Sequence, residues 1–151
     1  MPANNLLYDE AATEIIERVK KLQPGTPALW GKMNATEMLL HSNLCNSEIF
    51  EPVKPQKPTT PKQFLLRLLA LYIAPKFKRG VAGDRAKETA GKGRLVDFEK
   101  EKECFIVLIK HFTNHKGKLT FPHIAFGNIS TNEWGIAAYK HMDHHLRQFG
   151  V

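Results

Sequence analysis

The chain has 151 residues, of which 42% are hydrophobic and 25% carry a charge, and its mean hydropathy is -0.34. These values fit one folded domain, residues 1–151, and exclude a small disulfide-stapled scaffold, a disordered chain and a membrane-embedded protein. The formal net charge is +7, which raises nucleic acid and anionic membrane surfaces as possible partners. The distribution of this charge along the sequence decides between them and a solvated surface.

Four segments have the apolar spacing of amphipathic helices. They are predicted to run from about Tyr8 to Leu22, Asn34 to Phe50, Asp97 to shortly before Gly117, and Ser130 to nearly Gly150. The second and the fourth each begin with a capping-box pattern, in which a Ser or Asn is followed three residues later by a Glu. No series of segments alternates between apolar and polar residues as paired strands do. We therefore predict an all-α fold.

The connection between the second and third predicted helices is much longer than the others, at about 46 residues. It has a proline-rich start, an apolar run from Phe64 to Ala74, and a loop rich in Gly and Lys that ends at Arg94. This pattern predicts a four-helix bundle with a long crossover between helices two and three that carries an extra short helix. The apolar run is too short to span a bilayer, so no transmembrane segment is expected.

The positive charge is concentrated in this crossover. Residues 54–94 contain eleven Lys or Arg against two acids, a local charge of +9, whereas the remainder of the chain has a charge of -2. No nucleic-acid-binding motif or series of interleaved aromatic residues accompanies the charge, so we favour a solvated loop over a nucleic-acid site. Binding to anionic lipid or nucleic acid stays open as the alternative, and salt-dependent binding would reveal it.

Three of the seven histidines have positions suited to metal binding. On the fourth predicted helix, His141 and His145 share the inward-facing seam with Trp134, Ala138 and Gln148. Residues four apart on a helix have Cβ atoms about 5–6 Å from each other. Two imidazoles at this spacing can therefore converge on one ion.

His41 on the second predicted helix is the best third ligand, because it lies on an apolar stripe with Met38, Leu44 and Cys45. It reaches the level of the fourth-helix pair if the two helices run antiparallel. A hydrogen-bonded core histidine is the alternative for each residue alone. Three imidazoles in one apolar layer would each need a polar partner, however, and a divalent metal supplies it.

Three further residues are weaker candidates for a catalytic role. Glu48 could orient an imidazole or act as an acid or base, with a solvated carboxylate as the equal alternative. Cys45 could line the pocket, although a small buried apolar residue is the stronger alternative. His123 could reach the mouth of the bundle, although fixing its own loop is the stronger alternative.

The cysteines Cys45 and Cys104 lie in predicted helices, where we expect buried free thiols. The N-terminus has no basic segment followed by an apolar one, so no secretion signal is expected. Both features favour a cytoplasmic protein in a reducing compartment.

Two short motifs resemble the DinB-like (DinB/YfiT-like) superfamily of four-helix-bundle metalloenzymes. They are Met-Leu-Leu-His ending at His41, and His-Met-Asp-His-His-Leu-Arg-Gln from His141 to Gln148. The resemblance covers essentially the whole chain, and residues 30–33 and 122–134 resemble one bacterial branch of unknown function. The superfamily includes thiol-dependent transferases. The resemblance implies that His41, His141 and His145 hold the metal.

The resemblance and the three histidines together predict a metal-dependent enzyme, a thiol transferase or a hydrolase. Three neutral His ligands leave at least one position of a divalent ion, Zn or Ni, open to a water or thiol that the ion would acidify. The expected partner is a small-molecule substrate, which the resemblance implies to be a low-molecular-weight thiol, and related bundles imply a homodimer. The alternative is a non-enzymatic, stress-related binding or assembly module with a vestigial metal site.

Overall fold

The structure is a computed structural model that describes residues 4–54, 57–81 and 83–151. It is built from α-helices, with no strand in the part of the chain that it describes, where the only β-type pairing is an isolated bridge between His123 and Gly127. The helices are α1 (Asp9–Lys20), α2 (Ala35–Ile49), α3 (Pro61–Leu68), α4 (Phe98–Asn114) and α5 (Thr131–Gln148). The all-α prediction is confirmed, and the four predicted segments correspond to α1, α2, α4 and α5.

Local side-chain hydrogen bonds explain where α2 and α5 begin. The Asn34 side chain accepts a hydrogen bond from the Glu37 backbone N–H, and the Glu37 carboxylate accepts one from the Asn34 N–H, both at 2.9 Å. Ser130 and Glu133 form the same reciprocal pair at the start of α5. These capping boxes satisfy backbone N–H groups that the first helical turn leaves free, so the sequence pattern fixes both helix starts.

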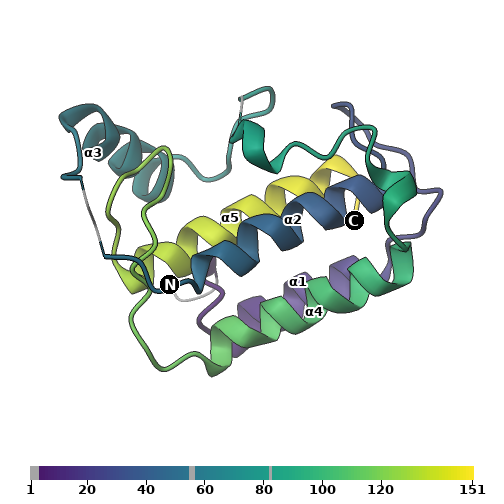
Figure 1. The fold of residues 1–151 in the computed structure, drawn as a ribbon, viewed down its shortest axis with the longest axis horizontal. Helices are drawn as coiled ribbons and strands as arrows, with labels where there is room; N and C mark the ends of the chain where they lie inside the picture. The colour runs from purple at the N-terminus through teal and green to yellow at the C-terminus, as the bar shows by residue number, and fades with distance from the viewer. Residues whose placement is uncertain (1–3, 55–56, 82) are drawn as a thin grey trace.

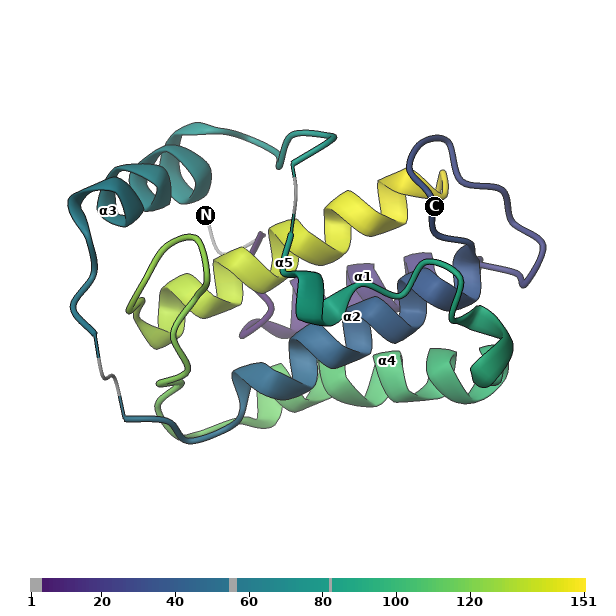
Figure 2. The same ribbon diagram turned by 45° about the horizontal axis from the view of Figure 1, so that its top comes forward.

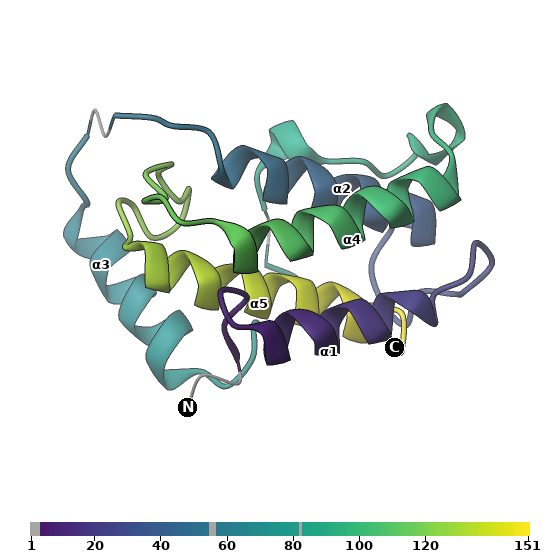
Figure 3. The same cartoon turned by 90° about the horizontal axis from the view of Figure 1, so that it is seen from below.

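The four longer helices lie side by side along the long axis of the molecule (Figure 1). α1 and α5 run in one direction, and α2 and α4 run in the other (Figure 3). Their fully buried side chains form a shared core, which includes Ile15, Val19, Met38, Leu39, Phe105, Ile109, Phe112, Met142 and Leu146. α2 and α5 are therefore antiparallel, the relation that brings His41 level with the two histidines of α5.

The prediction of which α2 residues face the core is partly wrong, because it included Leu44. Leu44 is 40% exposed, because the core face of α2 is formed by Met38, Leu39 and Ile49 together with the small polar residues Ser42 and Asn46. His41 and Cys45 lie on the flank of this face, where they meet α5 and the returning crossover. Cys104 is also exposed on α4 and not buried as expected.

The long crossover between α2 and α4 contains the predicted extra helix. α3 continues into one π-helical turn, Leu69–Ile73, and stands at one end of the molecule beside the four longer helices (Figure 2). The chain then returns along α2 through short 3₁₀ turns at Arg85–Lys87 and Gly93–Leu95. No helix in the described residues is long and apolar enough to cross a membrane.

The returning part of the crossover is fastened to the start of α2 by Glu37. Its carboxylate, already part of the capping box, also accepts hydrogen bonds from the backbone N–H groups of Gly91 and Gly93, at 2.7 and 3.3 Å. The Thr89 hydroxyl donates to the Glu37 carbonyl at 2.6 Å. One buried glutamate thus holds residues 89–93 in place, and this places Lys87, two residues before them, over His41.

Candidate metal centre

The imidazoles of His41, His141 and His145 converge through their Nε2 atoms. The His141 Nε2 lies 3.3 Å from the His41 Nε2 and 2.9 Å from the His145 Nε2. Two ligands at 2.0–2.1 Å from a tetrahedral ion are about 3.3 Å apart, so these separations suit donors around one ion. The structure therefore brings together the three residues that the sequence singled out.

The orientation of the His145 ring is set by Gln148. The Gln148 side-chain N–H donates to the Trp30 carbonyl at 2.9 Å, which fixes the amide so that its oxygen faces the His145 ring. That oxygen lies 2.9 Å from the His145 Nδ1, which must therefore donate its proton to it. A neutral ring with the proton on Nδ1 presents the lone pair of Nε2 to His141.

The orientation of the His41 ring is set in the same way by the crossover. Its Nδ1 lies 2.8 Å from the Lys87 carbonyl oxygen, which can only accept, so Nδ1 carries the proton and Nε2 the lone pair. The Lys87 side chain is itself anchored, because its ammonium group forms ion pairs with Glu48 at 2.6 Å and with Asp84 at 3.0 Å. These anchors keep the carbonyl in place over the ring.

The consequence is that the lone pairs at the centre of the cluster outnumber the imidazole protons, and the protonated Cys45 thiol, 3.8 Å from the His41 Nε2, is a further but weak donor to them. The Nε2 atoms of His41 and His145 both present lone pairs, and the Nε2 of His141 can supply at most one proton between them. A divalent cation accepts all three lone pairs at once. Hydrogen bonds from Nδ1 to a carbonyl or amide oxygen are also the usual outer support of metal-binding histidines, so the residues present fit a metal.

Burial keeps these imidazoles neutral, which is the form that binds metal. Removal from water lowers the pKa of His41 and lowers that of His141 well below its ordinary value. The pKa of His145, which is almost fully buried, falls to about 3 for the same reason. His41 and His141 each keep some solvent-accessible surface, whereas His145 is buried.

The lowered pKa values predict that acid destabilises the metal-free protein. In the unfolded chain each histidine binds a proton below about pH 6.5, whereas in the folded protein His145 stays neutral down to about pH 3. The neutral His145 therefore does not lower the free energy of unfolding above pH 6.5. As the pH falls from 6.5 toward 3, the free energy of unfolding decreases by about 1.4 kcal/mol per pH unit on account of His145 alone. Urea unfolding of chelator-treated protein between pH 7 and pH 5 measures this slope, and His145→Asn should make it shallower. An identical slope in the two proteins would contradict this assignment.

Cys45 lies one helical turn from His41 and is brought to the cluster. Its Sγ lies 3.8 Å from the His41 Nε2, and the donor atoms of His41, Cys45 and His141 all lie within 4.8 Å of one another, close enough to hold a metal ion. Burial raises the pKa of the Cys45 thiol to about 12, so it is protonated at neutral pH. Cys45 thus borders the cluster but lacks the thiolate form that a nucleophile needs.

The other two weaker candidates have different partners. The Glu48 carboxylate is paired with the Lys87 ammonium group, so it supports the anchor over His41 indirectly and does not touch an imidazole ligand. The Nδ1 of His123 accepts hydrogen bonds from the backbone N–H groups of Ala125 and Phe126, at 3.0 and 3.2 Å, and its ring stacks on that of Phe126. Burial lowers the pKa of His123 to about 4. His123 therefore fixes its loop, the stronger alternative in the sequence analysis.

Three supporting groups were not predicted: the Lys87 carbonyl, the Gln148 amide as a partner of His145, and Gly31. Gly31 has φ of +83°, and a Cβ there would meet the Gln148 Nε2, so only glycine lets the Trp30 carbonyl approach Gln148. Of these three groups, only Gln148 could have been found from the sequence, because it lies on the inward-facing seam three residues after His145. The Lys87 carbonyl had none, because a backbone oxygen carries no residue-specific pattern.

The family comparison covers nearly the whole chain. The model of the family DUF1569, described as a protein of unknown function, matches residues 3–150. No curated protein and no solved structure matches the chain. On the strength of the family match, this chain is a member of the DUF1569 family.

Proposed function

We propose that the protein is a metal-dependent enzyme of the DinB-like kind, in which the Nε2 atoms of His41, His141 and His145 hold one divalent ion, Zn or Ni. In this proposal α1, α2, α4 and α5 form the four-helix bundle of that superfamily. The observation that supports it most strongly is the pair of anchored rings, since the Gln148 oxygen and the Lys87 carbonyl turn two lone pairs toward the third imidazole. A purely structural cluster would have no need to direct both lone pairs to one point.

The chain supplies binding, orientation and access around this centre. A divalent ion held by three neutral imidazoles lowers the pKa of a water or thiol at its free coordination position. The partly exposed sides of His41 and His141 provide the access route for a small substrate. Burial raises the pKa of the Cys45 thiol, so in the protein without metal this thiol is protonated beside the site.

The substrate class that we propose is a low-molecular-weight thiol, which is transferred to an electrophile. The support is the resemblance of the two histidine motifs to a superfamily that includes thiol-dependent transferases. The described residues add a site of neutral imidazoles beside the Cys45 thiol, which burial keeps protonated in the protein without metal.

Elemental analysis tests metal binding, and a conjugation assay tests the reaction. Protein purified without chelator should contain about one Zn or Ni per chain, and the double variant His41→Ala, His141→Ala should contain none. Incubating small thiols with a panel of electrophiles should give conjugates in proportion to bound metal. Metal binding without any conjugation would favour the non-enzymatic module, whereas no metal in either protein after incubation with Zn²⁺ and Ni²⁺ would rule out the metal centre.

Gln148→Ala should weaken metal binding without unfolding the protein. The change removes the acceptor that orients the His145 ring, and outer partners of this type contribute about 10–100-fold to metal affinity. Competition with a chromophoric chelator measures the affinity. Gln23→Ala, at an exposed position in the loop after α1, is the matched control and should bind as the wild type does. Equal affinity in all three proteins would contradict the role assigned to Gln148.

A further inference from the structure

The crossover helix presents its apolar residues to solvent. No residue of α3 is buried, and the exposed fraction of its large side chains reaches 57% at Leu65. The exposed apolar residues of this outer face are Phe64, Leu65, Leu66, Leu68 and Leu69. Tyr72 and Ile73 instead line a cavity with Tyr8 and Ile136, and the Tyr72 hydroxyl donates to the Glu133 carboxylate at 3.0 Å. An apolar patch that is continuous along a helix is typical of an interaction surface and not of a solvated loop.

The side of α3 that faces the rest of the protein is polar, and its hydrogen bonds fix the orientation of the helix. The Arg67 guanidinium donates to the Asn128 carbonyl at 3.2 Å and lies 3.4 Å from the Glu133 carboxylate. Gln63 donates to the Ile124 carbonyl at 3.5 Å. The helix is thus held by its polar side, and the apolar side is left facing outward.

Lys140 of α5 holds the far end of the same segment. Its ammonium group is buried and donates to the carbonyl oxygens of Ala70, Leu71 and Ala74, at 2.7, 3.2 and 2.6 Å. These are carbonyls at the C-terminal end of the π-helical turn, where a positive charge is favourable. With Arg67 near its middle and Lys140 at its end, the segment cannot rotate to bury its leucines without breaking these bonds.

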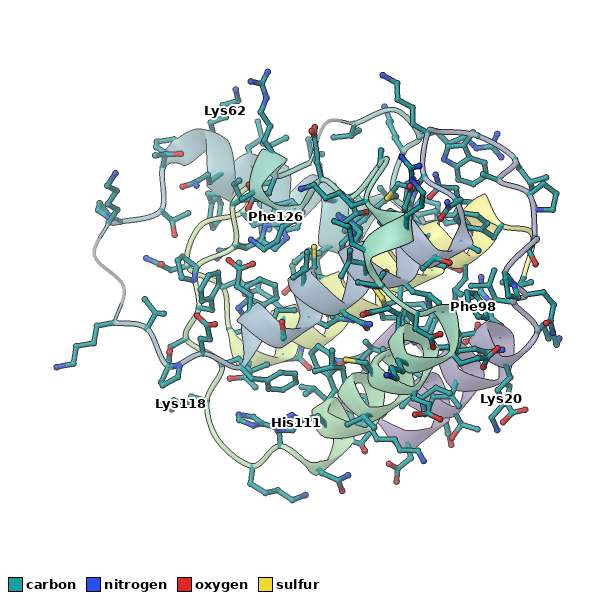
Figure 4. All side chains as sticks on the ribbon, turned by 45° about the vertical axis from the view of Figure 1, so that its right-hand side comes forward. Lys20, Lys62, Phe98, His111, Lys118 and Phe126 are labelled. Atoms are coloured by element: carbon teal, nitrogen blue, oxygen red, sulfur yellow. The ribbon has the colours of Figure 1, made fainter. Side chains whose placement is uncertain are left out.

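Positive charge flanks the outer face at both ends. Lys62 is exposed at the start of α3 and points away from the rest of the protein (Figure 4), and Lys76 and Lys78 follow the π-helical turn. The whole stretch 54–94 has a charge of +9. A short helix with an apolar outer face between lysines has the composition of helices that lie in the interface of anionic bilayers.

We propose that the outer face of α3 and Leu69 binds the surface of an anionic lipid bilayer. The leucines enter the boundary between headgroups and acyl chains, and the flanking lysines lie among anionic headgroups. A second copy of the chain fits this face less well, because pairing the two faces would bring the flanking lysines Lys62, Lys76 and Lys78 of both copies together. Nucleic acid also fits less well, because the face is mostly aliphatic and offers few groups for base stacking or hydrogen bonding. The inference does not depend on the proposed metal centre.

Co-sedimentation of the full chain with vesicles tests the proposal. The wild type should bind phosphatidylcholine vesicles that contain one quarter phosphatidylserine, bind vesicles of pure phosphatidylcholine much less, and be released by salt. The variant Leu65→Ser, Leu69→Ser removes two leucines of the outer face and should bind at least about tenfold more weakly. The variant Lys76→Gln, Lys78→Gln should also lose about tenfold or more, since each lysine contributes about fivefold.

Val107→Ser is the matched control, because Val107 is 65% exposed on α4, outside the proposed face, and should bind as the wild type does. Circular dichroism confirms that all variants are folded. No binding of the wild type to anionic vesicles at low salt would overturn the proposal, as would equal binding by the leucine variant. A wild-type dimer in light scattering that the leucine variant converts to a monomer would assign the face to a second copy. Binding to duplex DNA that only the lysine variant loses would assign the charge to nucleic acid.

Discussion

His145→Ala is expected to lower the affinity for Zn²⁺ by more than about 100-fold. The change removes one of three convergent nitrogens and leaves the His141 Nε2, which lies 2.9 Å from it, with a single neighbouring imidazole at 3.3 Å. Loss of an outer partner alone costs about 10–100-fold, so loss of a ligand should cost more. Isothermal titration of chelator-treated protein with Zn²⁺ measures the affinity and the stoichiometry.

A surface histidine provides the control for this measurement. His111 is exposed on α4 (Figure 4), and its ring stacks on that of Phe50, at the end of α2. His111→Ala should leave the affinity for Zn²⁺ unchanged. This control shows whether the loss of any imidazole, and not of His145 in particular, lowers the affinity. Equal affinities for wild type and His145→Ala would show that Zn²⁺ binds elsewhere.

Glu37→Ala should destabilise the protein by about 3 kcal/mol. The buried carboxylate accepts three backbone hydrogen bonds, from Asn34, Gly91 and Gly93, and alanine leaves these N–H groups without their acceptor. For a chain of this length the loss corresponds to a fall in the melting temperature of about 6–12 °C. The freed segment begins two residues after Lys87, whose carbonyl orients His41, so Zn²⁺ affinity should fall together with stability.

Glu17→Ala is the control for this prediction. Glu17 is exposed on α1 and pairs only with Lys20 at 2.6 Å, and a surface pair of this kind contributes less than about 1 kcal/mol. Thermal unfolding followed by circular dichroism compares the two variants. If Glu37→Ala melts within a degree or two of Glu17→Ala, the crossover is not fastened to α2 through Glu37.

The helices were predictable because their signals are local. The pairs Asn34 with Glu37 and Ser130 with Glu133 lie within one turn, so the sequence pattern and the hydrogen bonds coincide. The histidine cluster was predictable for a related reason, since two ligands share one helix face and the third needs only an antiparallel neighbour. Which face of α2 is buried was less evident, and Leu44 proved exposed because Ser42 and Asn46 occupy the core side in its place.

Features that depend on tertiary docking were not predictable. The extra short helix of the crossover was predicted, but the direction that its apolar residues face was not, because that orientation is decided by Arg67 and Lys140, whose partners lie more than 60 residues away in sequence. The second role of Glu37, as acceptor for Gly91 and Gly93, has the same origin. Sequence periodicity describes one helix at a time and contains no information about such distant partners.

The most direct measurement is the X-ray absorption fine structure of the protein loaded with one equivalent of Zn²⁺. Convergence of His41, His141 and His145 predicts a first shell with three imidazole nitrogens at about 2.0–2.1 Å and one oxygen from solvent, with no sulfur. His145→Ala should reduce the imidazole contribution from three nitrogens to two. A first shell of oxygen alone would contradict the metal centre, and a sulfur at about 2.3 Å would show that Cys45 fills the position that the proposed chemistry needs open.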